Sequence, residues 1–198
     1  MSMRLFLALT IAGFPGAAAA GQISSVYSDL DPEKDCTVFA AAGPGDGEWA
    51  NLVCNGYRGY PVFLSSADLR DSAFYGFPPR GDRAPAWESF SAFNSLGPKI
   101  EWRLEASNGS SVPFATIHRR LVSGGGDGAQ ATEVLVVSKV GQPQARDGCV
   151  VGLVLASGWP GANQAARNIA DEHARAFSCG SDRPVAIGEP MPDFRRSD

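Results

Sequence analysis

The sequence predicts an α+β protein in which an antiparallel β-sheet carries a C-terminal helix on one face and two disulfides hold the fold. Short apolar segments separated by turn residues run through most of the chain, and only residues 163–178 have helical spacing. The chain contains four cysteines, an even number that favours complete pairing. Its 23 glycines and 14 prolines are typical of a fold rich in strands and loops.

Residues 1–20 have the pattern of a secretory signal peptide. Arg4 precedes an apolar run over residues 5–11, and four alanines at 17–20 give small side chains before a cleavage site after Ala20. The alternative is a buried N-terminal helix. The run is shorter than the roughly 18 residues that a membrane span needs, so we expect a periplasmic or secreted protein that does not span the membrane. The remaining chain predicts one domain over residues 21–182 and a flexible tail over 183–198.

The first two cysteines flank a hairpin. Cys36 begins one apolar run and Cys54 ends another, and the glycine-rich turn at residues 43–47 lies between them. A hairpin centred near Gly45 places both cysteines opposite each other, at the about 4.5–5.5 Å spacing of paired strands. We therefore predict a Cys36–Cys54 disulfide.

The other two cysteines lie at the ends of a strand and a helix of similar length. Residues 149–157 predict a strand of about 27 Å, and residues 163–178 a helix of about 24 Å. A helix packed antiparallel on that strand returns Cys179 to Cys149, which favours this disulfide among the three possible connectivities. A zinc site is the alternative. It has little support because no two cysteines are close in sequence and the chain has only two histidines.

The other elements follow from turn signals and alternation. Strands are predicted at 22–26, 61–64, 100–105, 114–121 and 132–140, with a short helical turn at 65–70 and a long irregular loop at 74–93. The connections are too short for helical crossovers, so the sheet should be antiparallel. One helix face, formed by Ala166, Ile169, Ala170, His173 and Phe177, should cover the sheet side that carries Cys149, Val151, Leu153 and Leu155.

Four segments resemble a group of uncharacterised exported proteins of alphaproteobacteria. They are residues 59–62, 67–70, 97–104 and 113–117. The resemblance covers most of the chain after the predicted signal peptide and implies export. It implies no activity, so it assigns no functional residue.

No catalytic constellation stands out, and we predict neither a metal nor a cofactor. The chain has no G-x-S-x-G nucleophile motif, and disulfides would consume the thiols. An envelope hydrolase that uses His118 or His173 as base is the alternative function. We expect His118 to pair near Glu101 or Trp102 and to serve packing or a surface pair. We expect His173 to pack on the apolar helix face.

Carboxylates give no better acid–base pair. Glu101 and Glu105 alternate with Arg103 on what should be a solvated strand face, with Arg119 as a cross-strand partner. Asp171 and Glu172 fit an ordinary polar helix face.

The strongest functional signal is aromatic. Nine of the 19 aromatic side chains lie between residues 57 and 93, among four arginines. Aromatic and arginine side chains are enriched at binding interfaces. We therefore predict a non-catalytic binding module with Tyr57, Tyr60, Phe74, Tyr75, Phe77, Arg80, Arg83 and Trp87 as its site, and with Trp159 at the start of the last helix as a further contact.

The predicted partner is an envelope protein or glycan. We do not expect nucleic acid as a partner, because the chain has a formal net charge of −4 and phosphate binding favours a basic surface. Two alternatives remain open. The aromatic cluster could only anchor the loop to the sheet, and the protein could be a structural envelope component without a specific ligand.

Overall fold

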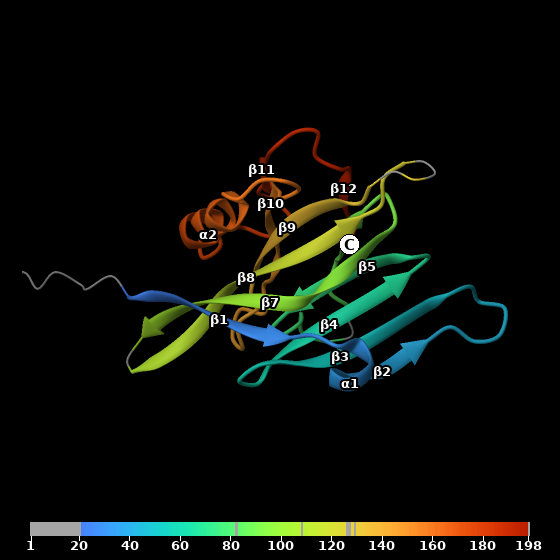
Figure 1. Cartoon of the computed structure of the whole chain (residues 1–198). Helices are drawn as coiled ribbons and strands as arrows, with labels where there is room; N and C mark the ends of the chain where they lie inside the picture. Colours follow the sequence, from blue (N-terminus) through green and yellow to red (C-terminus); the bar gives the residue numbers. More distant parts are fainter. Residues whose placement is uncertain (1–20, 82, 108, 126–127, 129, 198) are drawn as a thin grey trace, which may run out of the picture.

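The fold is built mostly from antiparallel sheets. The computed structural model describes residues 21–81, 83–107, 109–125, 128 and 130–197, so the predicted signal peptide lies outside the described residues. A six-stranded sheet A has the order β1-β7-β8-β9-β10-β11, and a four-stranded sheet B has the order β2-β3-β4-β5 (Figure 1). The third sheet is a two-stranded ribbon of β6 and β12.

The elements have the following bounds. Sheet A contains β1 (Ile23–Asp29), β7 (Asn94–Ser107), β8 (Ser110–Val122), β9 (Thr132–Lys139), β10 (Cys149–Leu155) and β11 (Val185–Ile187). Sheet B contains β2 (Cys36–Ala41), β3 (Trp49–Tyr57), β4 (Tyr60–Ala67) and β5 (Arg70–Tyr75). The ribbon is β6 (Trp87–Phe90) with β12 (Phe194–Ser197), and the helices are α1 (Pro32–Asp35) and α2 (Ala162–His173).

Sheet A is the central layer. Helix α2 packs on one of its faces, over a core that includes Ile117, Val137 and Ile169. The opposite face is covered by sheet B, around the fully buried Trp102, and by the β6–β12 ribbon, around Phe90. Figure 1 shows α2 and sheet B on opposite sides of sheet A. The predicted antiparallel sheet with a C-terminal helix on one face is confirmed, although "α+β" is a loose description because α2 has only 12 residues.

Both predicted disulfides are confirmed. Cys36 and Cys54 are direct cross-strand partners in β2 and β3, with Cα atoms 3.9 Å apart. Cys149 and Cys179 join the start of β10 to the segment after α2, with Cα atoms 5.7 Å apart. Two disulfides are typical of an oxidising, extracellular environment.

A β-bulge in β10 corrects the predicted strand face. The pairing with β9 shifts between Val150 and Gly152, which leaves Val151 as an extra residue. Cys149, Val151, Val154 and Ala156 therefore belong to the core under α2, while Leu153 and Leu155 join the cluster on the opposite side. The prediction that Leu153 and Leu155 face the helix is wrong because simple alternation does not survive an inserted residue.

The buried face of the helix differs from the prediction at one residue. Ala166, Ile169, Ala170 and Phe177 are buried as predicted, but Ala174 takes the buried place that we assigned to His173. The His173 side chain is exposed and lies 3.9 Å from a carboxylate oxygen of its neighbour Glu172. His173 is not a core residue.

The supposedly solvated strand face of β7 lies beneath α2. Arg103 donates to both carboxylate oxygens of Asp171, with Nε 2.9 Å from Oδ1, and Arg167 Nε donates to Glu101 Oε1 at 2.7 Å. Glu101 and Arg103 are 6% and 8% exposed, so the prediction of a solvated face is wrong. Arg119 pairs instead with Glu133 on β9.

Two predicted segments have a different structure. Residues 65–70 form no helical turn. They end β4, turn at Asp68 and Leu69 with φ of 48° and 57°, and begin β5. The predicted loop at 74–93 is irregular mainly between Gly76 and Ala86, because Phe74 and Tyr75 end β5 and residues 87–90 form β6.

The segment expected to be a loose tail contains two strands. β11 adds to sheet A as a parallel neighbour of β10, which is the exception to the antiparallel arrangement. β12 pairs with β6, and its Phe194 ring packs against Phe90 with centroids 5.1 Å apart. Strand pairing of β11 and β12 and the Phe194–Phe90 contact therefore hold this segment against the rest of the fold.

Candidate functional site

The outer face of sheet B carries two neighbouring rows of side chains that cross three strands. Antiparallel pairing aligns Val53, Phe63 and Phe74 into an apolar row, and Asn51, Ser65 and Ser72 into a polar row beside it. The residues between them along the strands, such as Leu64 and Ala73, point inward to the core. Strand periodicity thus makes one sheet face half apolar and half polar.

A groove lies over these rows. Its volume is about 350 Å³, within the range of small-ligand sites. Phe63 and Phe74 form part of its floor, and their rings contact each other edge to face at 6.4 Å. The walls come from β2, from the start of β6 and from the loop between β5 and β6. They are Phe39, Pro78, Pro79, Gly81, Arg83, Ala84, Pro85, Ala86 and Trp87.

The loop that forms the groove wall is anchored at both ends. At its start, the backbone N–H of Gly76 donates to Pro61 O, and that of Phe77 donates to Gly141 O, each at 2.8 Å. A Cβ at Gly76 would lie 2.3 Å from Gly141 O, so this close approach requires glycine. At its other end, the backbone N–H of Glu88 donates to Ser72 Oγ at 3.0 Å. The wall is therefore held in place without any ligand.

Three polar side chains of the groove have no hydrogen-bond partner among the described residues: Asn51, Ser65 and Arg83. Asn51 and Ser65 are direct cross-strand partners on the floor, and Arg83 is exposed at the rim. Ser72 Oγ accepts from Glu88 and keeps its own O–H available. Mostly apolar walls with a few convergent polar groups are characteristic of ligand-binding pockets.

Of the nine predicted binding residues, the structure brings Phe74, Arg83 and Trp87 together in this groove. Arg80 is exposed in the same loop but does not line it. Trp159 is separate from the groove residues, in the turn between β10 and α2, where its side chain covers Gly161 and is 42% exposed.

The other four predicted residues pack in or beside the core. Tyr57 and Tyr75 contact Trp102, with ring centroids 6.1 Å away in each case. Tyr60 packs against Phe77 at 5.3 Å, and its hydroxyl donates to Gln142 Oε1 at 3.0 Å. These contacts fit the alternative stated above, in which the aromatic side chains anchor the loop to the sheet.

Sequence reasoning missed Phe39, Asn51, Ser65 and Ser72 as groove residues. A signal was present, because extending the Cys36–Cys54 register through the next two hairpins places these side chains on the outer face. Because residues 65–70 were expected to form a helical turn, Ser65 was not assigned to a strand, and the polar row could not be recognised.

His118 is a buried structural residue. It is 0% exposed, its Nε2–H donates to Gly97 O at 2.6 Å, and its Nδ1 therefore accepts from the Tyr75 hydroxyl at 2.7 Å. Burial, together with the nearby charge of Arg120, lowers the pKa of His118 to about 3. It pairs with Ile100, not with Glu101 or Trp102, because the β7–β8 register starts from the Ser107–Ser110 pair, so the hairpin is centred before Gly109. A buried neutral imidazole cannot reach a substrate.

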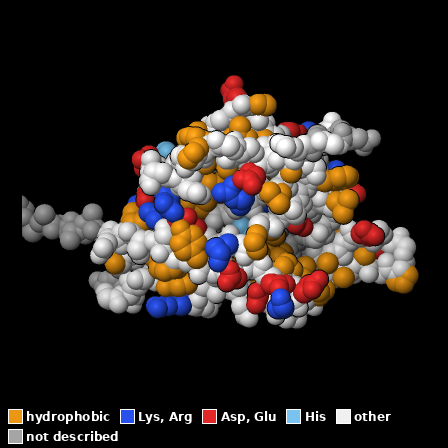
Figure 2. Space-filling view, in the orientation of Figure 1, with side chains coloured by type: hydrophobic (Ala, Val, Ile, Leu, Met, Phe, Trp, Pro, Cys, Tyr) orange, Lys and Arg blue, Asp and Glu red, His pale blue; other side chains and the backbone are white. Residues whose placement is uncertain are grey.

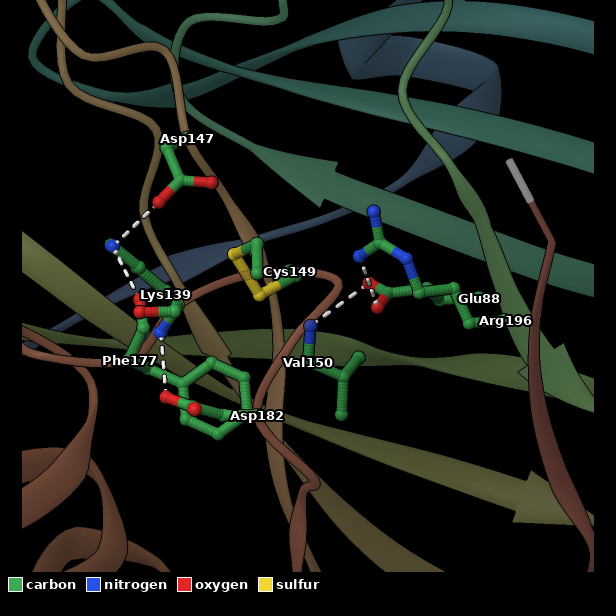
Figure 3. The surroundings of a disulfide bond; sticks show 10 residues. Glu88, Lys139, Asp147, Cys149, Val150, Phe177, Asp182 and Arg196 are labelled. Atoms are coloured by element: carbon green, nitrogen blue, oxygen red, sulfur yellow. Dashed lines mark hydrogen bonds and ion pairs between the residues drawn. A yellow bond between two sulfur atoms is a disulfide. The ribbon is translucent and has the colours of Figure 1, made fainter.

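A second cavity, of about 490 Å³, lies beside the Cys149–Cys179 disulfide, beneath the C-terminal segment. Figure 3 shows the buried Glu88 carboxylate between the backbone N–H of Val150, at 2.9 Å, and Arg196, at 3.1 Å. On the other side of the disulfide, Lys139 donates to Asp147 at 2.8 Å and to Phe177 O at 2.7 Å. Apart from Arg183, the charged groups that line this cavity are hydrogen-bonded or ion-paired within the chain, so it is a weaker candidate than the groove.

Charge and metal chemistry give no further site. On the face shown in Figure 2, acidic and basic side chains are interspersed and neither sign dominates. Within the described residues, no group of three or more His, Cys, Asp or Glu side chains is placed to hold a metal ion. None of the described helices is long and apolar enough to cross a membrane.

Known proteins provide no further guide to the site. No family model, no curated protein and no solved structure matches the chain.

Proposed function

We propose that this chain is an exported binding module, periplasmic or secreted, that holds part of an envelope partner in the groove on sheet B. The observation that carries the proposal is the amphipathic floor, where an apolar row runs beside a polar row whose Asn51 and Ser65 side chains have no partner in the described part of the chain. A ligand with one apolar face and one hydrogen-bonding edge would satisfy both rows.

The two histidines favour binding over hydrolysis. His118 is buried away from the groove's solvent, and among the described residues the exposed His173 contacts a carboxylate only at the adjacent Glu172. The signal-peptide pattern and the resemblance to exported proteins support an envelope location, and the two disulfides agree with it.

The experiment is an NMR titration of the ¹⁵N-labelled protein spanning residues 21–198. The probes are a neutral tetrasaccharide, an acidic tetrasaccharide and an extended octapeptide. At least one probe should shift the backbone amides of residues 51, 65 and 74. Ser65→Phe, which fills the floor from an outward-facing position, should abolish these shifts.

Thr37→Phe is the matched control, because Thr37 is also on the outer face of sheet B but does not line the groove. This variant should bind like the unaltered protein. If no probe shifts the groove amides, or if the shifts persist in Ser65→Phe, the groove is not the binding site.

A further inference from the structure

The floor of the groove matches the chemistry of a sugar ring. A pyranose has a C–H face that packs on aromatic side chains and hydroxyl groups around its edge. Phe63 and Phe74 offer the aromatic surface, and Asn51 and Ser65 offer hydrogen bonds in the neighbouring row. Asn51 supplies two N–H donors and one acceptor, and Ser65 supplies one O–H that also accepts, so both can bind hydroxyl groups.

The charge of the lining selects among sugars. Arg83 is the charged member of the described lining, which contains no carboxylate, although the whole chain has a net charge of −4. Arg83 forms no ion pair with any described residue. A guanidinium carries five N–H donors and no acceptor, and it binds carboxylates through two parallel hydrogen bonds. The complementary ligand is therefore an anion.

We propose that the groove binds an acidic saccharide, with its ring against Phe63 and Phe74, its hydroxyls on Asn51 and Ser65, and its carboxylate on Arg83. This inference rests on the proposed function and adds the ligand class. The sugar acid can belong to an envelope polymer or occur free in solution, and the experiment distinguishes these sources.

The test is isothermal titration calorimetry with tetragalacturonate, its carboxyl-reduced counterpart and monomeric galacturonate, in 50 mM and 500 mM salt. Tetragalacturonate should bind about tenfold more tightly than the reduced form, since only its carboxylates can accept two parallel hydrogen bonds from the Arg83 guanidinium. High salt should weaken its binding because Arg83 is exposed at the rim.

Two variants locate the charge. Arg83→Ala should weaken tetragalacturonate binding about tenfold and leave the reduced form unaffected. Arg80→Ala is the matched control, because Arg80 is an exposed arginine of the same loop that does not line the groove. It should bind like the unaltered protein, and both variants should keep its thermal stability.

The outcomes separate this inference from the proposed function. Equal binding of tetragalacturonate and its reduced form would overturn the acidic character and leave a saccharide-binding groove. Binding of neither, while the octapeptide shifts the groove amides, would overturn the saccharide and leave the binding module. Tighter binding of the tetramer than of the monomer would support an envelope polymer as the source, and equal affinities would support a free sugar acid.

Discussion

At the scale of single residues, His118 shows how burial fixes chemistry. The imidazole lies between the sheets with both nitrogens hydrogen-bonded, and Arg120 is close enough to disfavour a second positive charge. The neighbouring Tyr75 is also buried, which raises the pKa of its hydroxyl to about 12. The pair is therefore neutral at ordinary pH and acts as a packed hydrogen-bonded unit.

This state predicts an acid-sensitive fold. The pKa of His118 is lowered from 6.5 to about 3 on folding, so between these values the unfolded chain binds a proton that the folded chain does not. Stability should fall as pH drops below 6.5, by about 2–3 kcal/mol at pH 4.5 from this residue alone. Urea unfolding at several pH values between 7.5 and 4.5 measures this loss of stability.

His118→Gln should flatten that pH dependence, whatever its effect on stability at pH 7. His173→Gln, at the exposed histidine, should leave the dependence as it is. If both variants follow the unaltered protein, His118 is not the group that titrates.

At the scale of elements, helix α2 is held to sheet A by charge as well as by its apolar face. Arg103 binds Asp171, and Glu101 binds Arg167 and accepts from Ser25. Burial alone would raise the pKa of Glu101, but these hydrogen bonds outweigh it and hold the pKa below its usual value. The network fixes where the helix lies along the sheet.

Arg103→Ala should destabilise the protein by about 3 kcal/mol, because it leaves Asp171 facing the sheet without its bidentate partner. Arg119→Ala on the adjacent strand removes a more exposed pair with Glu133 and should cost under about 1 kcal/mol. Urea unfolding of both variants at pH 7 makes the comparison. Similar losses would show that burial does not set the strength of these pairs.

Strand β12 gives a second prediction at this scale. Deleting residues 193–198 removes Phe194 from Phe90 and Arg196 from the buried Glu88, so the free energy of unfolding should fall by about 2–4 kcal/mol. Arg195→Ala, at an exposed side chain, is the control. Thermal unfolding of the deletion variant and of the control measures this loss. An unchanged melting temperature after the deletion would mean that this segment contributes nothing to the stability of the fold.

At the scale of the whole molecule, each of the two main sheets is fastened by its own disulfide. The Cys36–Cys54 bond crosses sheet B, and the Cys149–Cys179 bond ties sheet A to the segment that follows α2. The bonds close loops with sequence separations of 18 and 30 residues. Each should stabilise the folded state mainly by restricting the unfolded chain.

Removing either disulfide by a double Cys→Ala change should lower the free energy of unfolding by about 3 kcal/mol. Since the bonds lie in different sheets, the two losses should add in the quadruple variant. Urea unfolding with and without reductant provides the measurement. A reduced protein as stable as the oxidised one would contradict this account.

The sequence was sufficient where one strong local signal decided the outcome. Two cysteines equidistant from a glycine-rich turn fixed the first hairpin, and a matched strand and helix fixed the second disulfide. The sequence was insufficient where a turn lacks glycine, as at Asp68 and Leu69, which have positive φ although neither is a glycine. The groove was only partly predictable, because its floor depends on register across β3, β4 and β5.

The extra residue in β10 has a consequence for how this gene can change over evolutionary time. The pairing with β9 passes directly from Val150 to Gly152, so losing Val151 would restore a regular ladder and leave every later side chain of the strand on its present face. Such a loss would remove one side chain from the core under α2, while Leu153 and Val154 would keep facing opposite cores. Losing Leu153 or Val154 with the bulge retained would instead reverse the side chains that follow, so descendants of this protein should tolerate a one-codon deletion at Val151 more readily than one within the regular pairing.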